Sequence, residues 1–298
     1  MLAAIDQLQW LLMNKVVSLI TYDSLAELDP DDHFLKEALE RRHVTVKAQV
    51  WDDEAVDWSG CGTCIIRSTW DYHRKFEKFC KWLQQVATLT TIFNEPSLLL
   101  WNARKTYLRE LSEAGLPVIP TRFFSKQFRP RISGTLREMG WNEAILKPTV
   151  GLATSGVKKF DMSLASIEAS ERHLESLLQD GEAMLQEFLP SVHYYGERSL
   201  IFIDGAYSHC VRKSAFQKLA VAGDAGETAA EATSEEISVA KEILSFLPAV
   251  PLYARVDLVR DKNDRPLLLE LELIEPSLFL ATAPAAADAL ADAIIRRI

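Results

Sequence analysis

The sequence has no run of basic residues, few cysteines and no apolar stretch long enough to cross a membrane. Its net charge of −9 argues against nucleic acid as a partner, because binding a polyanion requires clustered Lys and Arg. The apolar opening, residues 1–13, lacks a basic start and contains Asp6, so we expect an appended helix or an upstream start there. We therefore predict no membrane partner.

The four cysteines are too few and too scattered to form a disulfide framework in a chain of 298 residues, which suits a reducing cytosol. Cys61 and Cys64 form a CxxC pair, but no second CxxC or HxxxH pair follows, so ordinary free thiols are favoured over a zinc site. We predict a cytoplasmic globular protein with a large core. The sequence does not decide the oligomeric state, and a homodimer is one possibility.

The first hundred residues alternate strand and helix patterns. Strands are expected near residues 16–23, 44–51, 64–70 and 90–96, and helices over 29–42 and 75–89. Asp29-Pro30-Asp31 is a typical helix start. This β-α-β-β-α-β order predicts a small parallel α/β domain on the substrate side of the molecule, over residues 1–100.

A new helix is expected to begin near Asn102 and to end at Gly115, with Lys105 on its exposed face. Short strands and one helix follow to about Asp180. Further strands are expected over residues 184–190, 199–205 and 207–213. These patterns predict a central lobe over residues 101–185 and a C-terminal lobe over residues 186–298.

From Leu219 to Glu236 the composition narrows to Ala, Gly, Glu, Thr and Ser, with no apolar period. Such a segment is typical of a mobile loop or lid, and a plain disordered insertion fits the composition equally well.

Four charged residues stand in an otherwise Val- and Leu-rich pattern that predicts a β-hairpin near the C-terminus. Arg255 and Asp257 alternate with apolar residues before the turn, and Glu270 and Glu272 alternate with leucines after it. Each pair therefore lies on one strand face. With a turn centred on Asn263-Asp264, Asp257 falls opposite Glu270 and Arg255 opposite Glu272, so all four share a face.

The leucines on both sides predict that these strands are central, where a carboxylate is costly unless something pairs with it. Three carboxylates against one arginine leave negative charge that a divalent cation would neutralise, and an all-oxygen ligand set favours Mg²⁺ or Mn²⁺. Asp257, Glu270 and Glu272 should then converge on the metal. The alternative is an edge hairpin whose charged face is solvated.

A loop containing Gly151, Ser155 and Gly156 follows a predicted strand that ends at Lys147-Pro148. Its small residues let backbone N–H groups approach phosphate oxygens, and Lys147 supplies a cation for them. Taken alone, such a loop can be an ordinary turn, and Lys105 can be a solvated charge. The order of the whole series is more specific: two lysines with this loop, a Glu-bearing apolar segment, a third lysine, Arg-x-Asp and Glu-x-Glu.

In this order the series resembles the ATP-grasp superfamily, whose members hold MgATP between two α+β lobes and join a carboxylate to an amine through an acyl phosphate. The resemblance extends from about Asn102 to the C-terminus, and the family also has a preceding α/β domain. It implies an α/β protein with the ATP-grasp fold and an N-terminal parallel domain. It also implies ATP and Mg²⁺ (or Mn²⁺) as cofactors and a small-molecule substrate.

The resemblance implies a role for each residue of the series. ATP would be bound by Lys105, Lys147, Gly151, Ser155, Gly156, the hinge residues Gln186, Glu187, Phe188 and Leu189, and Glu197 at the ribose. Lys213 would approach the phosphates, Arg255 would steady the transferred phosphoryl group, and Asp257, Glu270 and Glu272 would bind the metals. The family usually has Asn where this chain has Glu272, which leaves open whether Glu272 or Glu275 completes the metal shell.

The segments IIRSTWDY and LELELIEPSLF are similar to a small subgroup that includes the cyclo-ligase of cycloserine biosynthesis, which closes O-ureido-D-serine into a ring. The substrate candidates are Arg67, Ser68, Thr69, Trp70, Asp71, Tyr72, Glu275 and Ser277. Arg67 would pair with a substrate carboxylate, and Trp70 and Tyr72 would wall the pocket. Equally, Trp70 and Tyr72 would be packing residues and Asp71 a helix cap.

The leading hypothesis is an ADP-forming carboxylate–amine ligase, either intermolecular or ring-closing. One alternative is a nucleotide-binding protein of the same superfamily without ligase activity. Another is a phosphotransferase that uses the same MgATP site with an alcohol acceptor.

Overall fold

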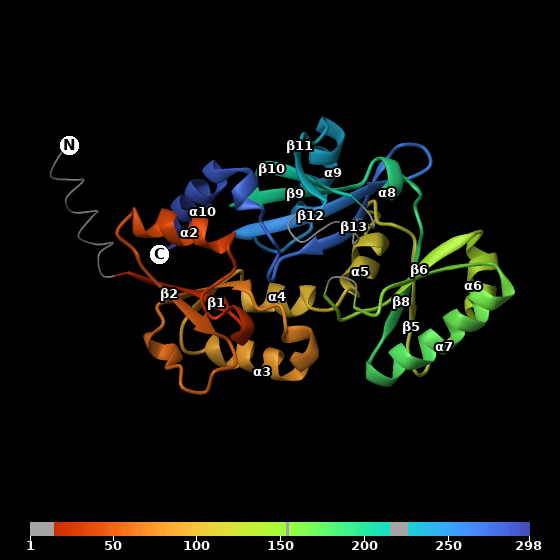
Figure 1. The fold of residues 1–298 in the computed structure, drawn as a ribbon, viewed down its shortest axis with the longest axis horizontal. Coiled ribbons are helices and arrows are strands. Elements are labelled where there is room, and N and C mark those ends of the chain that lie inside the picture. Colours follow the sequence, from red (N-terminus) through yellow and green to blue (C-terminus); the bar gives the residue numbers. More distant parts are fainter. Residues whose placement is uncertain (1–14, 153–154, 215–225) are drawn as a thin grey trace.

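The computed structural model describes residues 15–152, 155–214 and 226–298. The chain forms three sheets that follow one another along the long axis of the molecule (Figure 1). The expected N-terminal extension, residues 1–13, lies outside the described residues. In the described ranges, no helix is long and apolar enough to cross a membrane.

The first sheet is parallel, with the order β2-β1-β3-β4, as the alternating sequence pattern predicted. Its strands are β1 (Val16–Thr21), β2 (Thr45–Val50), β3 (Thr63–Ser68) and β4 (Thr91–Phe93). Helices α2 (Asp32–Glu40) and α3 (Phe76–Val86) pack on opposite faces of this sheet. Leu19 of β1 shares an apolar cluster with Leu35 of α2, whereas the next residue, Ile20, points the other way and shares a cluster with Phe79 of α3. Short 3-10 helices occur at Asp23–Leu25, Trp58–Gly60, Tyr72–Lys75 and Leu280–Thr282.

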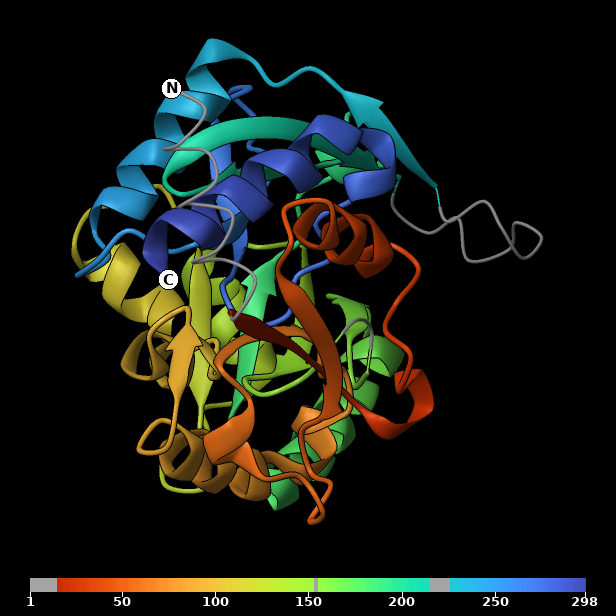
Figure 2. The ribbon, with the colours of Figure 1, turned by 90° about the vertical axis from the view of Figure 1, so that its left-hand side faces the viewer.

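The second sheet is antiparallel, with the order β11-β10-β9-β12-β13. Its strands are β9 (Glu197–Ile203), β10 (Ala206–Lys213), β11 (Glu227–Ala230), β12 (Tyr253–Arg260) and β13 (Pro266–Glu272), with helices α8 (Ser191–Tyr194), α9 (Ser234–Ser245) and α10 (Pro284–Arg297). The C-terminal helix α10 lies beside α2 of the first domain, where Arg42 Nε is 2.7 Å from Asp292 Oδ1 (Figure 2). The two ends of the described chain therefore share one apolar core.

The third sheet has the order β5-β8-β6-β7, with strands β5 (Thr121–Phe124), β6 (Glu143–Pro148), β7 (Lys158–Asp161) and β8 (Ala183–Glu187). Two helices, α6 (Ile132–Met139) and α7 (Leu164–Asp180), pack on it through the apolar cluster that contains Leu136, Leu146 and Leu174. We had expected a single helix in this part of the chain. The short helix α6 is terminated by Gly140, which adopts the left-handed conformation (φ 70°) that is common at helix C-termini.

The predicted start of the helix from Asn102 to Gly115 is wrong. Helix α4 (Pro96–Asn102) ends at Asn102, and α5 begins only at Tyr107 and ends at Glu113. Lys105 lies in the turn between them, and its backbone N–H donates to Thr149 O at 2.8 Å. This contact ties the turn to the end of β6, so Lys105 is held by the third sheet rather than by a helix.

The prediction of an unstructured segment from Leu219 to Glu236 is wrong for its second half. There the chain forms strand β11 and begins helix α9, whose first turn has a capping box between Thr233 and Glu236. Residues 219–225 lie outside the described part of the chain. A strand at a sheet edge pairs through its backbone and needs no apolar period, so the composition of this segment did not indicate β11. The T-x-x-E capping signature was readable in the sequence.

The C-terminal hairpin has the predicted register. Asp257 pairs with Glu270 and Arg255 with Glu272, and a β-bulge follows Asp257. β12 is an inner strand, but β13 is the edge of its sheet, so the expectation of two central strands is wrong for β13. The edge is nevertheless covered, because Leu268 N–H donates to Pro117 O at 2.7 Å and its carbonyl accepts from Ile119 N–H.

Candidate active site

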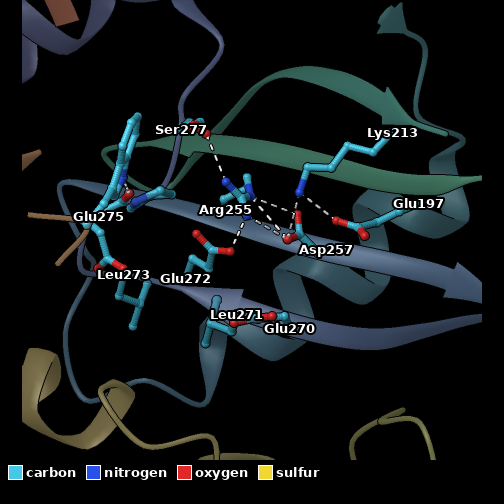
Figure 3. Close-up of polar contacts among 12 residues, drawn as sticks. Glu197, Lys213, Arg255, Asp257, Glu270, Leu271, Glu272, Leu273, Glu275 and Ser277 are labelled. Atoms are coloured by element: carbon cyan, nitrogen blue, oxygen red, sulfur yellow. Dashed lines mark hydrogen bonds and ion pairs between the residues drawn. The ribbon is translucent and has the colours of Figure 1, made fainter. Parts of the chain in front are cut away.

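Arg255 is the centre of the polar cluster on the hairpin (Figure 3). It is 6% exposed, and its guanidinium donates to both oxygens of Asp257, at 3.0 Å from Nε to Oδ1 and 3.0 Å from Nη2 to Oδ2. It also forms an ion pair with Glu272 and donates from Nη1 to Ser277 O at 3.3 Å. The planar five-donor group of arginine allows one side chain to bind acceptors from three segments at once.

Lys213, at the end of β10, extends this cluster toward β9. Its Nζ lies 2.6 Å from Glu197 Oε1 and 3.3 Å from Asp257 Oδ2. The pairing of Lys213 with Glu197 follows from the antiparallel register of β9 and β10. Asp257 on β12 is therefore held between Arg255 and Lys213, and Figure 3 shows the three side chains pointing toward one another.

A second group of contacts joins the hairpin to the third sheet. Lys105 Nζ lies 3.0 Å from Glu270 Oε1 and donates to Gly151 O at 2.8 Å. Lys147, at the end of β6, is only 7% exposed and forms no hydrogen bond or ion pair with the described residues. The two lysines therefore lie beside the predicted phosphate loop. Lys105 is bound to it, and Lys147 has no partner in the described part of the chain.

The charges in this site act strongly on one another because burial removes their solvent screening. Burial alone would raise the pKa of Asp257, but Arg255 and Lys213 more than offset it and hold that pKa well below its usual range. Burial lowers the pKa of Lys147 to about 8. Burial also raises the pKa of Glu272 to about 7, although Arg255 opposes the shift, and that of Glu275 to about 8, with the Glu272 charge adding to it.

The carboxylates do not converge as the metal hypothesis expected. Asp257 and Glu272 are drawn to Arg255, and Glu270 is drawn to Lys105. Within residues 15–152, 155–214 and 226–298, no three or more His, Cys, Asp or Glu side chains are arranged to hold a metal ion. The donor set still fits Mg²⁺, because the three side chains offer only oxygens and Asp257 stays ionised at neutral pH. Their metal-binding role remains a prediction.

The expected hinge lies where β8 ends. Gln186 is buried, with its side-chain amide 3.3 Å from Thr121 Oγ1, and the Phe188 N–H donates to Glu143 O at 3.1 Å. Lys159 Nζ lies 3.6 Å from the centre of the Phe188 ring. Of the other residues predicted to bind ATP, Leu189 is buried against Ile119 and Val259, and the Glu187 N–H donates to Pro120 O. Ser155 and Gly156 follow the part of the loop that is not described. At Gly156, with φ 70°, a Cβ would meet Pro148 Cδ at 3.1 Å, so only glycine fits easily.

The segment Arg67–Tyr72, expected to bind substrate, makes mostly internal contacts. Arg67 is 2% exposed; its Nε lies 2.8 Å from Asp32 Oδ1, and its Nη2 donates to Pro276 O at 2.9 Å. Ser68 Oγ also donates to Asp32, and Asp71 accepts from the Trp51 indole. Asp71 stands at the N-cap position of the 3-10 helix Tyr72–Lys75, but its side chain makes no cap hydrogen bond there. The substrate-binding role of the segment stays a prediction.

Two residues of that segment differ in their surroundings. Tyr72 packs in the apolar cluster with Phe79, with ring centres 4.7 Å apart. Trp70 instead donates its indole N–H to Glu275 O at 3.1 Å. Trp70 therefore links the first sheet to the chain that leaves β13. Tyr72 also lies near the charged site, because the charges of Glu275, Glu270 and Glu272 add to the effect of burial in raising its pKa.

Replacing Asp32 by alanine should lower the free energy of unfolding by about 3 kcal/mol, because the Arg67 charge would stay buried without its partner. Urea denaturation measures this. The control is Asp288→Ala, which breaks exposed pairs with Arg41 and Arg42 and should cost less than about 1 kcal/mol. Equal losses in both variants would show that the Arg67–Asp32 pair does not stabilise the fold.

Four residues that sequence analysis missed hold the hairpin in place. The Asn102 side chain donates to Leu271 O and accepts from Leu273 N–H, both at 2.9 Å, and the Tyr107 hydroxyl binds both backbone groups of Leu271 at the same distance. In the same way, the other two, Asn94 and Tyr253, bind backbone groups near the hairpin. These partners are far apart in the sequence, so no local pattern signals them.

Comparison with known proteins places this site in a family. Residues 17–94 match the family model of the N-terminal domain of D-cycloserine synthetase DcsG. The chain is 31% identical over 300 residues to the cycloserine biosynthesis protein DcsG of Streptomyces lavendulae, covering 95% of this chain and 99% of that protein. The crystal structure of D-cycloserine synthetase DcsG is similar with a TM-score of 0.84 and 29% identity, again covering 95% of this chain and 99% of that one.

A RimK-domain ATP-grasp protein from Sphaerobacter thermophilus has the same fold, with a TM-score of 0.69 and 16% identity over 95% of this chain and 99% of that one. The predicted fold class and the resemblance to the ATP-grasp superfamily are thereby confirmed. So is the likeness to the cycloserine subgroup, which rests on the full length of the chain. The chain belongs to the DcsG family of ATP-grasp enzymes and is an ATP-dependent ligase that joins a carboxylate to an amine on a small substrate.

Proposed function

We propose that the chain uses MgATP to phosphorylate the carboxylate of a small amino-acid-like substrate, with release of ADP. A nitrogen of the same molecule then attacks the acyl phosphate, which closes a ring and releases inorganic phosphate. The similarity to a cycloserine biosynthesis protein over nearly the whole of both chains supports the ring-closing reaction. The observation that carries the proposal is the row of buried and half-buried charges that runs from Lys147 and Lys105 through Glu270 and Asp257 to Arg255.

The lysines would bind the triphosphate. A triphosphate at this place would meet the three free donors of Lys147, and Lys105 already holds the loop carbonyl of Gly151 next to it. Lys213 lies at the opposite end of the row, beside Glu197, the residue proposed to hold the ribose. Pairing the buried Lys147 ammonium with an anion is favourable, because burial without a counter-charge disfavours the cation.

Arg255 would steady the transferred phosphoryl group and the acyl phosphate, because its donors already lie in a buried site where charge stabilisation is strong. Asp257, Glu270 and Glu272 would hold Mg²⁺, which when bound offsets the negative charge of phosphoryl transfer. To accept the metal, Asp257 and Glu272 would give up part of their contact with Arg255. The guanidinium would then become free to face the phosphoryl group.

The test is ADP release from MgATP with a panel of small amino acids and carboxylates, including O-ureido-D-serine. Ring closure predicts ADP release with that compound alone, without a second substrate. A requirement for a separate amine would indicate an intermolecular ligase, and transfer to an alcohol a phosphotransferase. ATP binding without ADP release from any compound would contradict the proposal.

A further inference from the structure

The carboxyl group of Glu275 has no hydrogen-bond or ion-pair partner among residues 15–152, 155–214 and 226–298. The residue is 6% exposed, yet no hydrogen bond or ion pair of its side chain occurs among the described residues. In Figure 3 no dashed line reaches its carboxylate. A buried carboxylate without a partner is costly, so its presence needs an explanation outside the described contacts.

The cations around Glu275 are already engaged. The charged groups that act most strongly on it are Glu272, Lys105, Glu270 and Arg255. Lys105 is bound to Glu270 and to the loop carbonyl of Gly151, and Arg255 is bound to Asp257 and Glu272. Its carboxylate neighbours repel it. Lys105 and Arg255 lower the pKa of Glu275, but burial and the neighbouring carboxylates outweigh them and raise it to about 8. Among the described residues, no cation forms an ion pair with this side chain, so a bound cation would stabilise its ionised form.

The backbone of Glu275 places it on the side of the site that faces the first domain. Its carbonyl accepts the Trp70 indole N–H, and the next carbonyl, of Pro276, accepts from Arg67. The phosphate loop lies instead beside Lys105, which also binds Glu270. The Glu275 backbone is thus held against the first sheet, while its carboxylate lies close enough to Glu272 and Lys105 for their charges to act on it. A substrate bound next to the transferred phosphoryl group would be within reach of this carboxylate.

We propose that the Glu275 carboxylate binds the ammonium group of the substrate and so selects amino acids over other small carboxylic acids. The inference rests on the proposed function, since it assigns a group of the same substrate. An ammonium group offers three donors and one positive charge, which one carboxylate can satisfy. A divalent cation needs several oxygen ligands, and the described residues hold no group of three ready for one.

The experiment compares wild type with Glu275→Gln, which removes the charge and keeps the shape. Binding of O-ureido-D-serine and of its desamino analogue, with hydrogen in place of the α-amino group, is measured by calorimetry with Mg²⁺ and a non-hydrolysable ATP analogue. The variant should bind O-ureido-D-serine about 30-fold more weakly and the desamino analogue as well as wild type does. Glu242→Gln, on the exposed side of α9, serves as the matched control.

A metal-binding role for Glu275 predicts a different result: weaker binding of both compounds and a higher Mg²⁺ requirement, as expected for Glu270→Gln. That result, or equal binding of O-ureido-D-serine by variant and wild type, would overturn the proposal. If binding depends on the amino group but wild type releases no ADP, the role of Glu275 is supported and the ring-closing function is contradicted. If ADP is released and Glu275→Gln has an unchanged KM, the ring-closing function is supported and the role of Glu275 is contradicted. If wild type binds neither compound, both proposals are contradicted.

Discussion

Arg255→Lys is expected to lower kcat by about 1,000-fold while changing the affinity for ATP little. Lysine keeps the positive charge but cannot contact Asp257, Glu272 and the Ser277 carbonyl together, as the guanidinium does. The phosphoryl group would then lose a fixed pair of donors, whereas the lysines that bind the triphosphate would be untouched. Initial rates of ADP release at saturating ATP measure kcat, and calorimetry with an ATP analogue measures affinity.

Arg137→Lys on the exposed side of α6 is the control and should leave both quantities unchanged. An Arg255→Lys enzyme with wild-type kcat would exclude Arg255 from the chemical step. An equal loss of ATP affinity and kcat would mean that Arg255 binds the nucleotide in the ground state instead.

The hairpin register was predictable because strand geometry has a strict period of two. Once the turn was placed near Asn263, the alternation of Arg255, Asp257, Glu270 and Glu272 left only one pairing that keeps all four on one face. What the pattern could not show is how the side chains pair when no ligand is present. In the structure Arg255 binds two of the carboxylates, so the same four residues form ion pairs instead of an open metal cage.

The position of Lys105 shows where periodicity misleads. The residues around it are good helix formers, but the turn is set by long-range contacts: Lys105 N–H with Thr149, and the Asn102 side chain with β13. Tertiary hydrogen bonds override local propensity when they satisfy backbone groups of an otherwise open sheet edge. The order of charged residues, through the family resemblance, predicted that Lys105 and Lys147 both contact the ATP phosphates, and this role stays a prediction. In the structure Lys105 donates to the loop carbonyl of Gly151, which agrees with it.

The segment Arg67–Tyr72 was harder to interpret because binding and buried structural residues share the same chemistry. A buried arginine at the end of a parallel strand fits a substrate carboxylate as well as it fits Asp32, and Asp32 lies 35 positions earlier in the chain. Only the three-dimensional contact distinguishes the two. Among the residues that the structure describes, the Glu275 side chain has no partner, a feature that no sequence pattern can display.

Lys147→Ala is expected to weaken ATP binding by about 300-fold, or about 3.4 kcal/mol, because the triphosphate would lose a desolvated cation with three free donors. The variant should be as stable as wild type or more stable without nucleotide. Burial lowers the pKa of Lys147 to about 8, which means that the fold disfavours its charge when no anion is present. Calorimetry with an ATP analogue and the unfolding temperature of the free protein measure the two effects.

The opposite signs of these two effects separate a binding role from a structural one. A lysine that served the fold would lower the unfolding temperature on removal, and its loss would weaken ATP binding only through partial unfolding. Lys241→Ala, on the exposed side of α9, controls for the loss of a positive charge at a distance and should change neither quantity. Unchanged ATP affinity in Lys147→Ala, with the fold intact, would place the triphosphate away from the end of β6. That result would contradict the proposal that Lys147 binds the triphosphate.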